Sequence, residues 1–163
     1  ALFRKEILHD LRFPKGILHE DEEFTPQLML RAENLYFTNN KAYYYRKREG
    51  SIMHKRDKRW HIRRLSDAEQ VLYRLKERVD YLPVKERIAM ERRIAQLTMD
   101  HIYNVITMTH DETHLDHVLQ RLSRHGLFPL PDKDYTSKYK WFRRMTNSSF
   151  GRKTLIMLLR AKG

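Results

Sequence analysis

The sequence contains no cysteine, and this absence excludes several classes of site. Without thiols the chain cannot form a disulfide scaffold, a thiolate zinc site or an iron–sulfur cluster. It has 163 residues but only 5 glycines and 5 prolines, too few for the many tight turns of an all-β domain. No apolar run approaches the roughly 20 residues that a membrane-spanning helix needs. We therefore expect one all-α domain with a modest core and no transmembrane segment.

Positive charge, in contrast, is abundant and unevenly distributed. Lys and Arg number 33 against 21 Asp and Glu, a net charge of +12. Residues 41–64 hold ten basic and two acidic side chains, and residues 138–163 hold eight basic and no acidic ones, so each segment carries +8. The remaining residues are slightly acidic. Such a distribution is typical of a protein that contacts a polyanion, because each cation at a phosphate releases condensed counterions.

Aromatic residues are interleaved with the charge in both basic segments. Rings of this kind can stack on unpaired bases while the cations hold the backbone, as in the recognition of single-stranded RNA. They could equally pack on the core or on a neighbouring protein. The aromatic residues are Tyr43, Tyr44, Tyr45 and Trp60 in the first segment and Tyr139, Trp141, Phe142 and Phe150 in the second.

Hydrophobic spacing predicts three helices in the middle of the chain. Ser66 and Glu69 have the spacing of a capping box, which predicts a helix that begins after Ser66 and ends before Pro83. A second helix is predicted over 84–108, with two apolar stripes, one of them including Ile88, and therefore with partners on two sides. A second capping box, from Thr109 to Glu112, predicts a third helix that ends near 126.

The flanking segments are less regular in sequence. We expect one short helix within 3–11, another beginning at Thr25-Pro26, an exposed acidic run at 20–23, an irregular segment over 127–147 and a final helical turn or two over 154–161. The predicted organisation is an N-terminal extension (1–64) with a basic arm (41–64), a helical hairpin core (65–126) and a basic C-terminal extension (127–163). The predicted fold class is all-α, a long antiparallel helical hairpin plus a third helix, with basic extended N- and C-terminal arms that order on a partner.

Three histidines resemble a metal-ligand cluster. On a helix, His110 and His114 would lie one turn apart with His117 one turn further, so two or three imidazoles could converge on zinc. We expect a solvated polar face instead, because a fourth ligand is not evident and exposed histidines are common. A zinc-dependent enzyme is a third-ranked alternative. With no glycine-rich phosphate loop or catalytic triad in the sequence, we expect no cofactor, no small-molecule substrate and no enzymatic activity.

Two stretches carry a resemblance to a known family. Residues 63–66 read Arg-Arg-Leu-Ser, followed by Leu72-Tyr73 and by Leu-Lys-Glu-Arg at 75–78, and residues 98–106 read Thr-Met-Asp-His-Ile-Tyr-Asn-Val-Ile. Over about 62–112 the chain resembles the mitochondrial form of the ribosomal large-subunit protein twenty-nine family. The resemblance implies a long α-hairpin on rRNA near the polypeptide exit tunnel, structural rather than catalytic. It also implies the mitochondrial matrix as location, rRNA and neighbouring ribosomal proteins as partners, and no homo-oligomer.

The predicted RNA-binding residues combine three groups. Most are cations of the two arms, some match basic positions of the family, and two in the second helix are selected by charge. They are Lys41, Arg46, Lys47, Arg48, Lys55, Arg56, Lys58, Arg59, Trp60, Arg63, Arg64, Lys76, Arg78, Arg92, Arg93, Lys138, Lys140, Arg143, Arg144, Arg152 and Lys153.

A second interpretation begins from Leu72-Tyr73-Arg74, the tripeptide of the mitochondrial LYR-motif proteins. That resemblance implies an accessory or assembly subunit of a mitochondrial membrane (respiratory) complex. The cations would then face acidic lipids or subunits, and residues 155–159 would touch the bilayer. The sequence begins at Ala1 without a signal-peptide pattern, so we expect any targeting segment to have been cleaved or to lie upstream.

Overall fold

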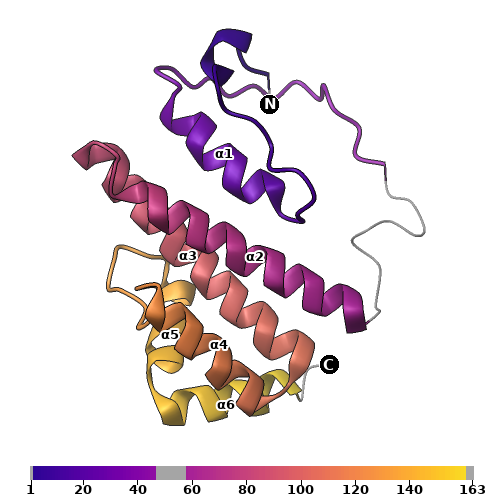
Figure 1. The fold of residues 1–163 in the computed structure, drawn as a ribbon, viewed down its shortest axis with the longest axis vertical. Helices are drawn as coiled ribbons and strands as arrows, with labels where there is room; N and C mark the ends of the chain where they lie inside the picture. Colours follow the sequence, from indigo (N-terminus) through magenta and orange to yellow (C-terminus); the bar gives the residue numbers. More distant parts are fainter. Residues whose placement is uncertain (1, 47–57, 161–163) are drawn as a thin grey trace.

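The computed structural model describes residues 2–46 and 58–160, and within these ranges the chain is all-α, as predicted (Figure 1). No strand occurs in the described ranges. The elements, in chain order, are the 3-10 turn η1 (Lys5–Leu8) and the helices α1 (Glu20–Leu30), α2 (Lys58–Val79), α3 (Val84–Thr109), α4 (Glu112–Arg124), α5 (Ser137–Asn147) and α6 (Ser149–Arg160).

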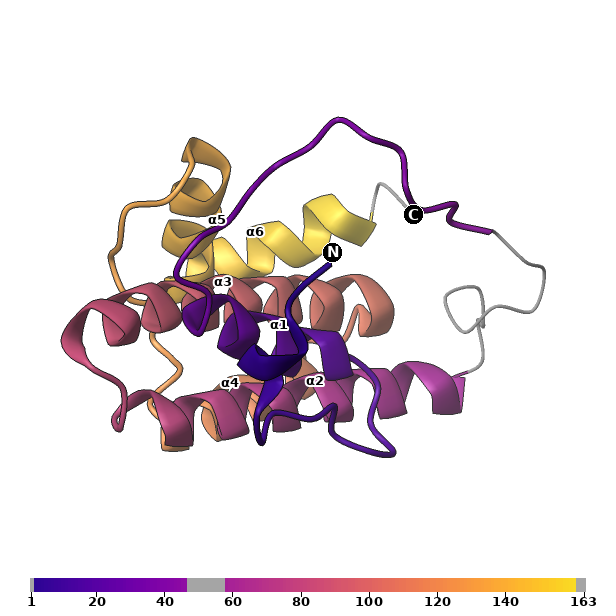
Figure 2. The same cartoon turned by 90° about the horizontal axis from the view of Figure 1, so that it is seen from above.

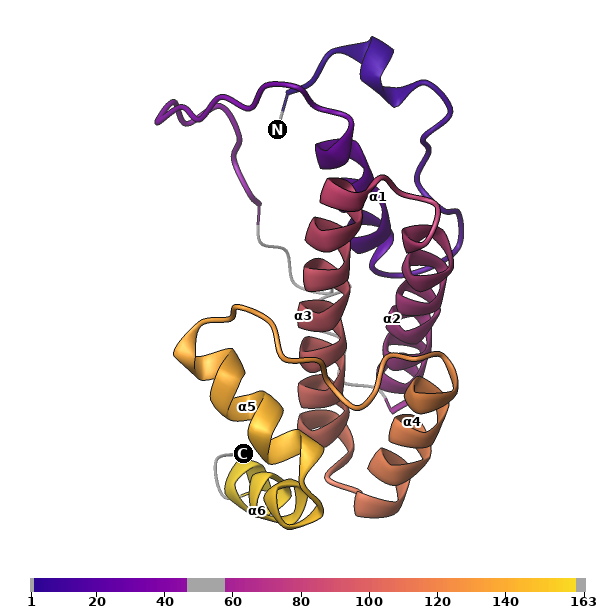
Figure 3. The ribbon, with the colours of Figure 1, turned by 90° about the vertical axis from the view of Figure 1, so that its left-hand side faces the viewer.

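The two longest helices form the predicted antiparallel hairpin. The short turn 80–83 joins α2 to α3, and the two helices lie side by side in Figure 3. The apolar face that the sequence predicts for α2 is buried against α3, with at most 1% of each side chain exposed. Its residues are Val71, Leu72, Leu75 and Val79.

Helix α3 is the centre of the molecule. It contacts α1, α2, α4, α5 and α6, which confirms the prediction of partners on two sides. Figure 3 shows α3 between α2 on one side and α5 and α6 on the other. Ile88 departs from the prediction, because its side chain is 60% exposed. It lies near the hairpin tip, where Tyr81 and Val84 are also exposed, so three apolar side chains at the tip are uncovered by the described residues.

Both predicted capping boxes are wrong. Helix α2 already includes Lys58, so Ser66 lies inside it, and Glu69 is 6% exposed and does not cap the helix. At α4 the cap is Asp111, whose Oδ1 accepts from the backbone N–H of His114 at 3.0 Å. Thr109 instead ends α3, with its hydroxyl donating to the carbonyl of Val105. Ser, Thr and Asp favour caps only where the chain changes direction, which short spacing patterns do not reveal.

The C-terminal segment contains two packed helices. The irregular segment expected over 127–147 is wrong from Ser137 onward, where α5 begins, whereas the helical turn or two expected over 154–161 is confirmed through residue 160 as part of α6. The irregular chain is limited to residues 125–136, which include Pro129 and Pro131. Helices α5 and α6 then add Phe142, Leu155 and Ile156 to the same core as the hairpin. The division of the chain at 64 and 126 stays a prediction, although the C-terminal helices share the core of the hairpin.

A glycine makes the corner between α5 and α6. Gly151 is buried, and a Cβ built on it would lie 2.7 Å from the Cα and 2.8 Å from the carbonyl carbon of Met145. Real Cβ atoms are not found that close to backbone. The two helices can therefore cross this tightly only because residue 151 has no side chain.

The N-terminal segment folds onto α2. The helix predicted within 3–11 is the short turn η1, and α1 begins at Glu20, so Pro26 lies inside α1 and does not open it. The acidic run occupies the first turn of α1, where the helix dipole favours negative charge. Glu23, expected at the surface, is only 4% exposed. A small separate cluster of Leu11, Phe24 and Leu28 holds η1 and α1 together.

Residues 32–46 have no regular helix or strand and lie outside the helical body. Figure 2 shows this segment arching away from α1. Six of its large side chains are exposed, three of them almost completely, with Tyr36 at 91%, Phe37 at 96% and Tyr44 at 88%. The predicted basic arm therefore begins in an extended segment, and its last residues, from 58 onward, belong to α2.

Candidate nucleic-acid interface

One face of α5 presents an aromatic ring between two cations. Lys138, Trp141 and Arg144 follow one another at intervals of three residues, which places them on one side of the helix. The indole of Trp141 is 50% exposed. Within the described ranges neither flanking cation makes a hydrogen bond or an ion pair. We call these three residues the α5 face.

The inward side of α5 fixes this face to the body of the protein. Phe142 is 9% exposed and meets the ring of Tyr103 edge-on, with 6.2 Å between ring centroids. The hydroxyl of Tyr139 donates to Oδ1 of Asp100 on α3 at 3.0 Å. Burial raises the pKa of Asp100 and that of Tyr139, which shows that both groups are partly removed from solvent. The hydrogen bond between them holds α5 against α3. Phe142 and Tyr139 are therefore structural, and they leave Trp141 as the exposed ring of the helix.

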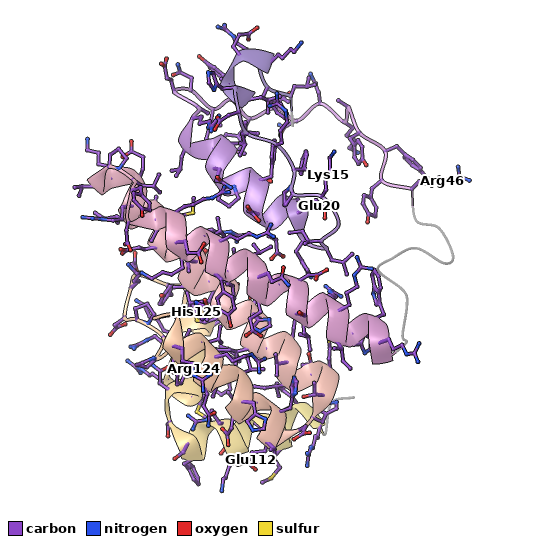
Figure 4. The ribbon with its side chains drawn as sticks, in the orientation of Figure 1. Lys15, Glu20, Arg46, Glu112, Arg124 and His125 are labelled. Carbon is purple, nitrogen blue, oxygen red and sulfur yellow. The ribbon has the colours of Figure 1, made fainter. Side chains whose placement is uncertain are left out.

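Several predicted RNA-binding cations are paired within the fold. Arg143 lies 2.8 Å from Asp132, and Lys140 lies 3.6 Å from Asp134, so both hold the preceding loop against α5. Arg152 donates to the carbonyl of Thr146 at 3.1 Å and lies 4.0 Å from Asp116. Lys153 lies 3.9 Å from Glu112, at the start of α4 (labelled in Figure 4). These four cations primarily tie α5 and α6 to their neighbours.

The family-matched cations of the hairpin also have protein partners. Arg63 donates to the carbonyl of Gly16 at 3.0 Å and lies 3.6 Å from Asp67. Arg64 donates to Nε2 of His19 at 3.3 Å, and Arg78 donates to Oε1 of Gln27 at 2.6 Å. These contacts join the N-terminal segment to α2. Lys76 and Arg93 are half-buried and act electrostatically on nearby carboxylates, whereas Arg92 is exposed on α3.

The predicted N-terminal cations divide between described and undescribed residues. Lys41 and Arg46 are exposed in the extended segment, and Figure 4 shows Arg46 at its far end, away from the helices. Arg59 is exposed and Trp60 is half-buried in the first turn of α2. Lys58 is the first residue of α2, and only the backbone of Lys58 is described. Lys47, Arg48, Lys55 and Arg56 lie outside the described residues.

The three histidines do not share one helix face as the sequence suggested. His110 ends α3 in a left-handed conformation, with φ of 50°, and its carbonyl accepts from Arg160. His114 and His117 lie on α4, the first half-buried and the second exposed. Within the described ranges, no group of three His, Cys, Asp or Glu side chains is placed to hold a metal ion.

Sequence reasoning missed a buried polar network that joins three helices. The carboxylate of Glu69 on α2 accepts from Nε and Nη2 of Arg121 on α4 at 2.7 and 2.9 Å, and from the hydroxyl of Tyr73. His101 on α3 lies 3.7 Å away. Burial raises the pKa of Glu69, but these neighbours outweigh it and hold the pKa well below its usual range. The ring of Tyr73 stacks on that of His125 at 3.7 Å.

Comparison with protein-family models, with curated proteins and with solved structures finds no significant match to this chain. The chemistry of its surface must therefore carry any functional argument. No helix in the described ranges is both long enough and apolar enough to cross a bilayer. The surface features that stand out are the α5 face, the exposed aromatic segment 32–46 and the apolar outer side of α6, where Phe150, Met157 and Leu158 are exposed.

Proposed function

We propose that this chain is a structural, non-catalytic component of the mitochondrial large ribosomal subunit and that it binds rRNA. The observation that carries the proposal is the α5 face, where an exposed indole lies between two exposed cations that make no hydrogen bond or ion pair within the described ranges. This combination binds single-stranded nucleic acid, because the ring stacks on a base while the cations contact the phosphates on either side.

The extended segment 32–46 supports the same proposal. It exposes six large apolar or aromatic side chains to solvent, which a chain does not do at low cost unless a partner covers them. Lys41 and Arg46 lie among these rings. Extensions of ribosomal proteins that order between rRNA and neighbouring proteins need this mixture of rings and cations. The six exposed side chains are Leu35, Tyr36, Phe37, Tyr43, Tyr44 and Tyr45.

The α2–α3 hairpin is the frame that the proposed function requires. It is the element in which the sequence resembles the ribosomal protein twenty-nine family, and it has the long antiparallel form that the resemblance implies. Because its matched cation Arg63 donates to the carbonyl of Gly16 in the N-terminal segment, we assign direct RNA contact mainly to the α5 face and to residues 32–46. Arg92 on α3 contributes further exposed charge.

A salt-dependent binding measurement tests the proposal. The affinity of the full chain for a large-subunit rRNA fragment is measured over a range of salt concentrations, first unmodified and then with Lys138→Glu and Arg144→Glu together. Each phosphate contact contributes about 0.7 to the slope of log affinity against log salt for single strands. The charge-reversed variant should therefore bind more weakly, with a slope lower by about 1.4.

A matched control separates local contact from net charge. Lys85→Glu with Arg124→Glu changes the charge equally on α3 and α4, and both side chains are exposed. We expect the control to retain most of the affinity. Equal losses in both variants would assign the binding to general attraction, and no measurable binding of rRNA by the unmodified chain would contradict the proposed function.

The outer side of α6 favours a second candidate, the accessory subunit of a membrane complex. Phe150, Met157 and Leu158 are 79%, 71% and 51% exposed, enough to contact a bilayer or an apolar subunit. The LYR tripeptide gives it little support, because Leu72 is buried, Tyr73 bonds to Glu69 and Arg74 bonds to Glu23. Binding to vesicles of acidic phospholipid that is lost in Met157→Ser with Leu158→Ser would favour this candidate over the ribosome.

A further inference from the structure

An arginine-rich cleft lies between α2, α1 and the chain that precedes α1. Its volume is about 440 Å³, within the range of small-ligand sites, roughly 300–1,000 Å³. Four guanidinium groups line it against two carboxylates, so the lining carries an excess of two positive charges. The charged lining residues are Arg12, Arg31, Arg74, Arg78, Asp10 and Glu23.

The fold holds these guanidinium groups in place. Glu23, 4% exposed, accepts from Nη1 of Arg74 at 3.3 Å and lies 3.7 Å from Nη1 of Arg78. Arg31 donates to Asp10 at 2.7 Å through Nη2 and to the carbonyl of Leu8 at 2.7 Å through Nη1. Arginines fixed in this way lose little side-chain entropy when they bind an anion.

The same contacts leave donors available. A guanidinium has five N–H donors, and the hydrogen bonds and ion pairs in the described ranges use only Nη1 of Arg12, Arg74 and Arg78. Arg12 donates from Nη1 to the carbonyls of His9 and Leu11, both at 2.8 Å. The side chains of Arg74 and Arg78 are 40% and 56% exposed, so a ligand can reach them from solvent.

We propose that this cleft binds a phosphate of an RNA backbone, an inference that rests on the proposed function. The polar, positively charged lining disfavours an apolar ligand or a metal cation. Guanidinium groups match phosphate oxygens in paired hydrogen bonds, and several of them around one cleft neutralise a phosphodiester that a single cation holds weakly. The cleft includes Arg12, Arg31 and Arg74, which the sequence did not place among the RNA-binding residues.

The test uses two probes, inorganic pyrophosphate and an oligouridylate of about 12 nucleotides. Affinities of the full chain are measured by calorimetry for the first and by fluorescence anisotropy for the second. The cleft variant is Arg12→Gln with Arg78→Gln, which leaves Arg74 beside the buried Glu23. The matched control, Lys85→Gln with Arg124→Gln, removes the same charge from exposed positions that do not line the cleft.

We expect the cleft variant to lose at least about tenfold in affinity for pyrophosphate, because each lost bond is to a charged acceptor. Its affinity for oligouridylate should fall as well, with a salt slope lower by about 0.7, whereas the control should keep both affinities. Thermal unfolding verifies that each variant is folded. Arg12→Lys with Arg78→Lys keeps the charge, and an affinity between those of the unmodified chain and the cleft variant would support paired hydrogen bonding.

Two results would overturn the inference: no binding of pyrophosphate by the unmodified chain, or equal pyrophosphate affinities for the cleft variant and the control. A different combination of results would contradict the proposed function and leave the phosphate site standing. If the chain binds pyrophosphate through the cleft but binds no oligouridylate, the cleft remains a phosphate site and its RNA ligand is refuted. If oligouridylate binds equally to all variants, RNA binding stands and the cleft takes no part in it.

Discussion

Arg121 on α4 donates two parallel hydrogen bonds to the carboxylate of Glu69 on α2, at 2.7 and 2.9 Å, although the two residues are 52 positions apart. The carboxylate is almost buried, and the guanidinium is 44% exposed. A guanidinium that makes two hydrogen bonds to one carboxylate fixes the relative orientation of the two side chains. This pair therefore sets the position of α4 on the hairpin.

Removing the arginine should destabilise the fold. Arg121→Met leaves the buried charge of Glu69 with only Tyr73 and the more distant His101, so we expect a loss of about 3 kcal/mol in the free energy of unfolding. Urea denaturation measures it. Gln120→Met, at the neighbouring exposed position, should change stability by less than about 0.5 kcal/mol. A similar small change in Arg121→Met would show that the pair contributes nothing.

Acid should weaken the same network. The pKa of Glu69 is lower in the folded protein than its usual value of 4.5, so the unfolded chain binds the proton more readily. The stabilisation is therefore complete above the unfolded pKa and is lost as the pH falls through it and towards the folded pKa. Urea midpoints measured between pH 7 and pH 3 should fall more steeply in the unmodified chain than in Glu69→Gln. Parallel pH profiles would contradict this assignment.

The corner at Gly151 should tolerate no side chain. A methyl group there would overlap the carbonyl oxygen of Met145 and lie 2.7 Å from its Cα, and backbone on two packed helices cannot move aside cheaply. Gly151→Ala should therefore cost about 2 kcal/mol or more in the free energy of unfolding. Gly16→Ala is a useful contrast, because Gly16 has open space around it but a φ of 80°, so its cost comes from backbone strain alone, about 1 kcal/mol. Thermal melting curves of the two variants test this comparison: a loss in Gly151→Ala no larger than that in Gly16→Ala would contradict the close contact at Gly151.

Trp141 should contribute more to binding than Tyr81 does. Trp141 is 50% exposed, so Trp141→Ala should lower the melting temperature modestly, because half of the side chain is buried, and should reduce RNA affinity by about 1–3 kcal/mol, the contribution of one base stacked on a ring. Tyr81→Ala, at the exposed tip of the hairpin, is the matched control and should bind normally. Equal affinity for Trp141→Ala and Tyr81→Ala would exclude base stacking at the α5 face.

Local periodicity in the sequence correctly predicted the buried faces of the two hairpin helices. The apolar spacing of Val71, Leu75 and Val79 predicted the buried face of α2, and the two stripes of α3 predicted its central position. It misjudged the start of α2, because Ser66 and Glu69 have cap spacing inside a helix whose first turns are mostly charged. It also missed α5, because the prolines before that helix suggested an irregular segment.

Long-range pairing explains the misses at the candidate site. Glu23 and Glu69 are buried because Arg74 and Arg121, about 50 positions away in each case, lie beside them. No local pattern reveals such partners. For the same reason, sequence could not distinguish Arg143, which pairs with Asp132, from Arg144, which stays exposed on the next position of the same helix.

Sedimentation through a sucrose gradient tests the central proposal most directly. Mitochondrial lysate is separated at moderate and at high salt, and the chain is followed in each fraction. We expect the chain to travel with the large ribosomal subunit and to be released by nuclease. We also expect Lys138→Glu with Arg144→Glu to shift it to the top of the gradient at lower salt than the unmodified chain. A chain that never enters the large-subunit peak, or that travels instead with a detergent-extracted membrane complex insensitive to nuclease, would contradict the account.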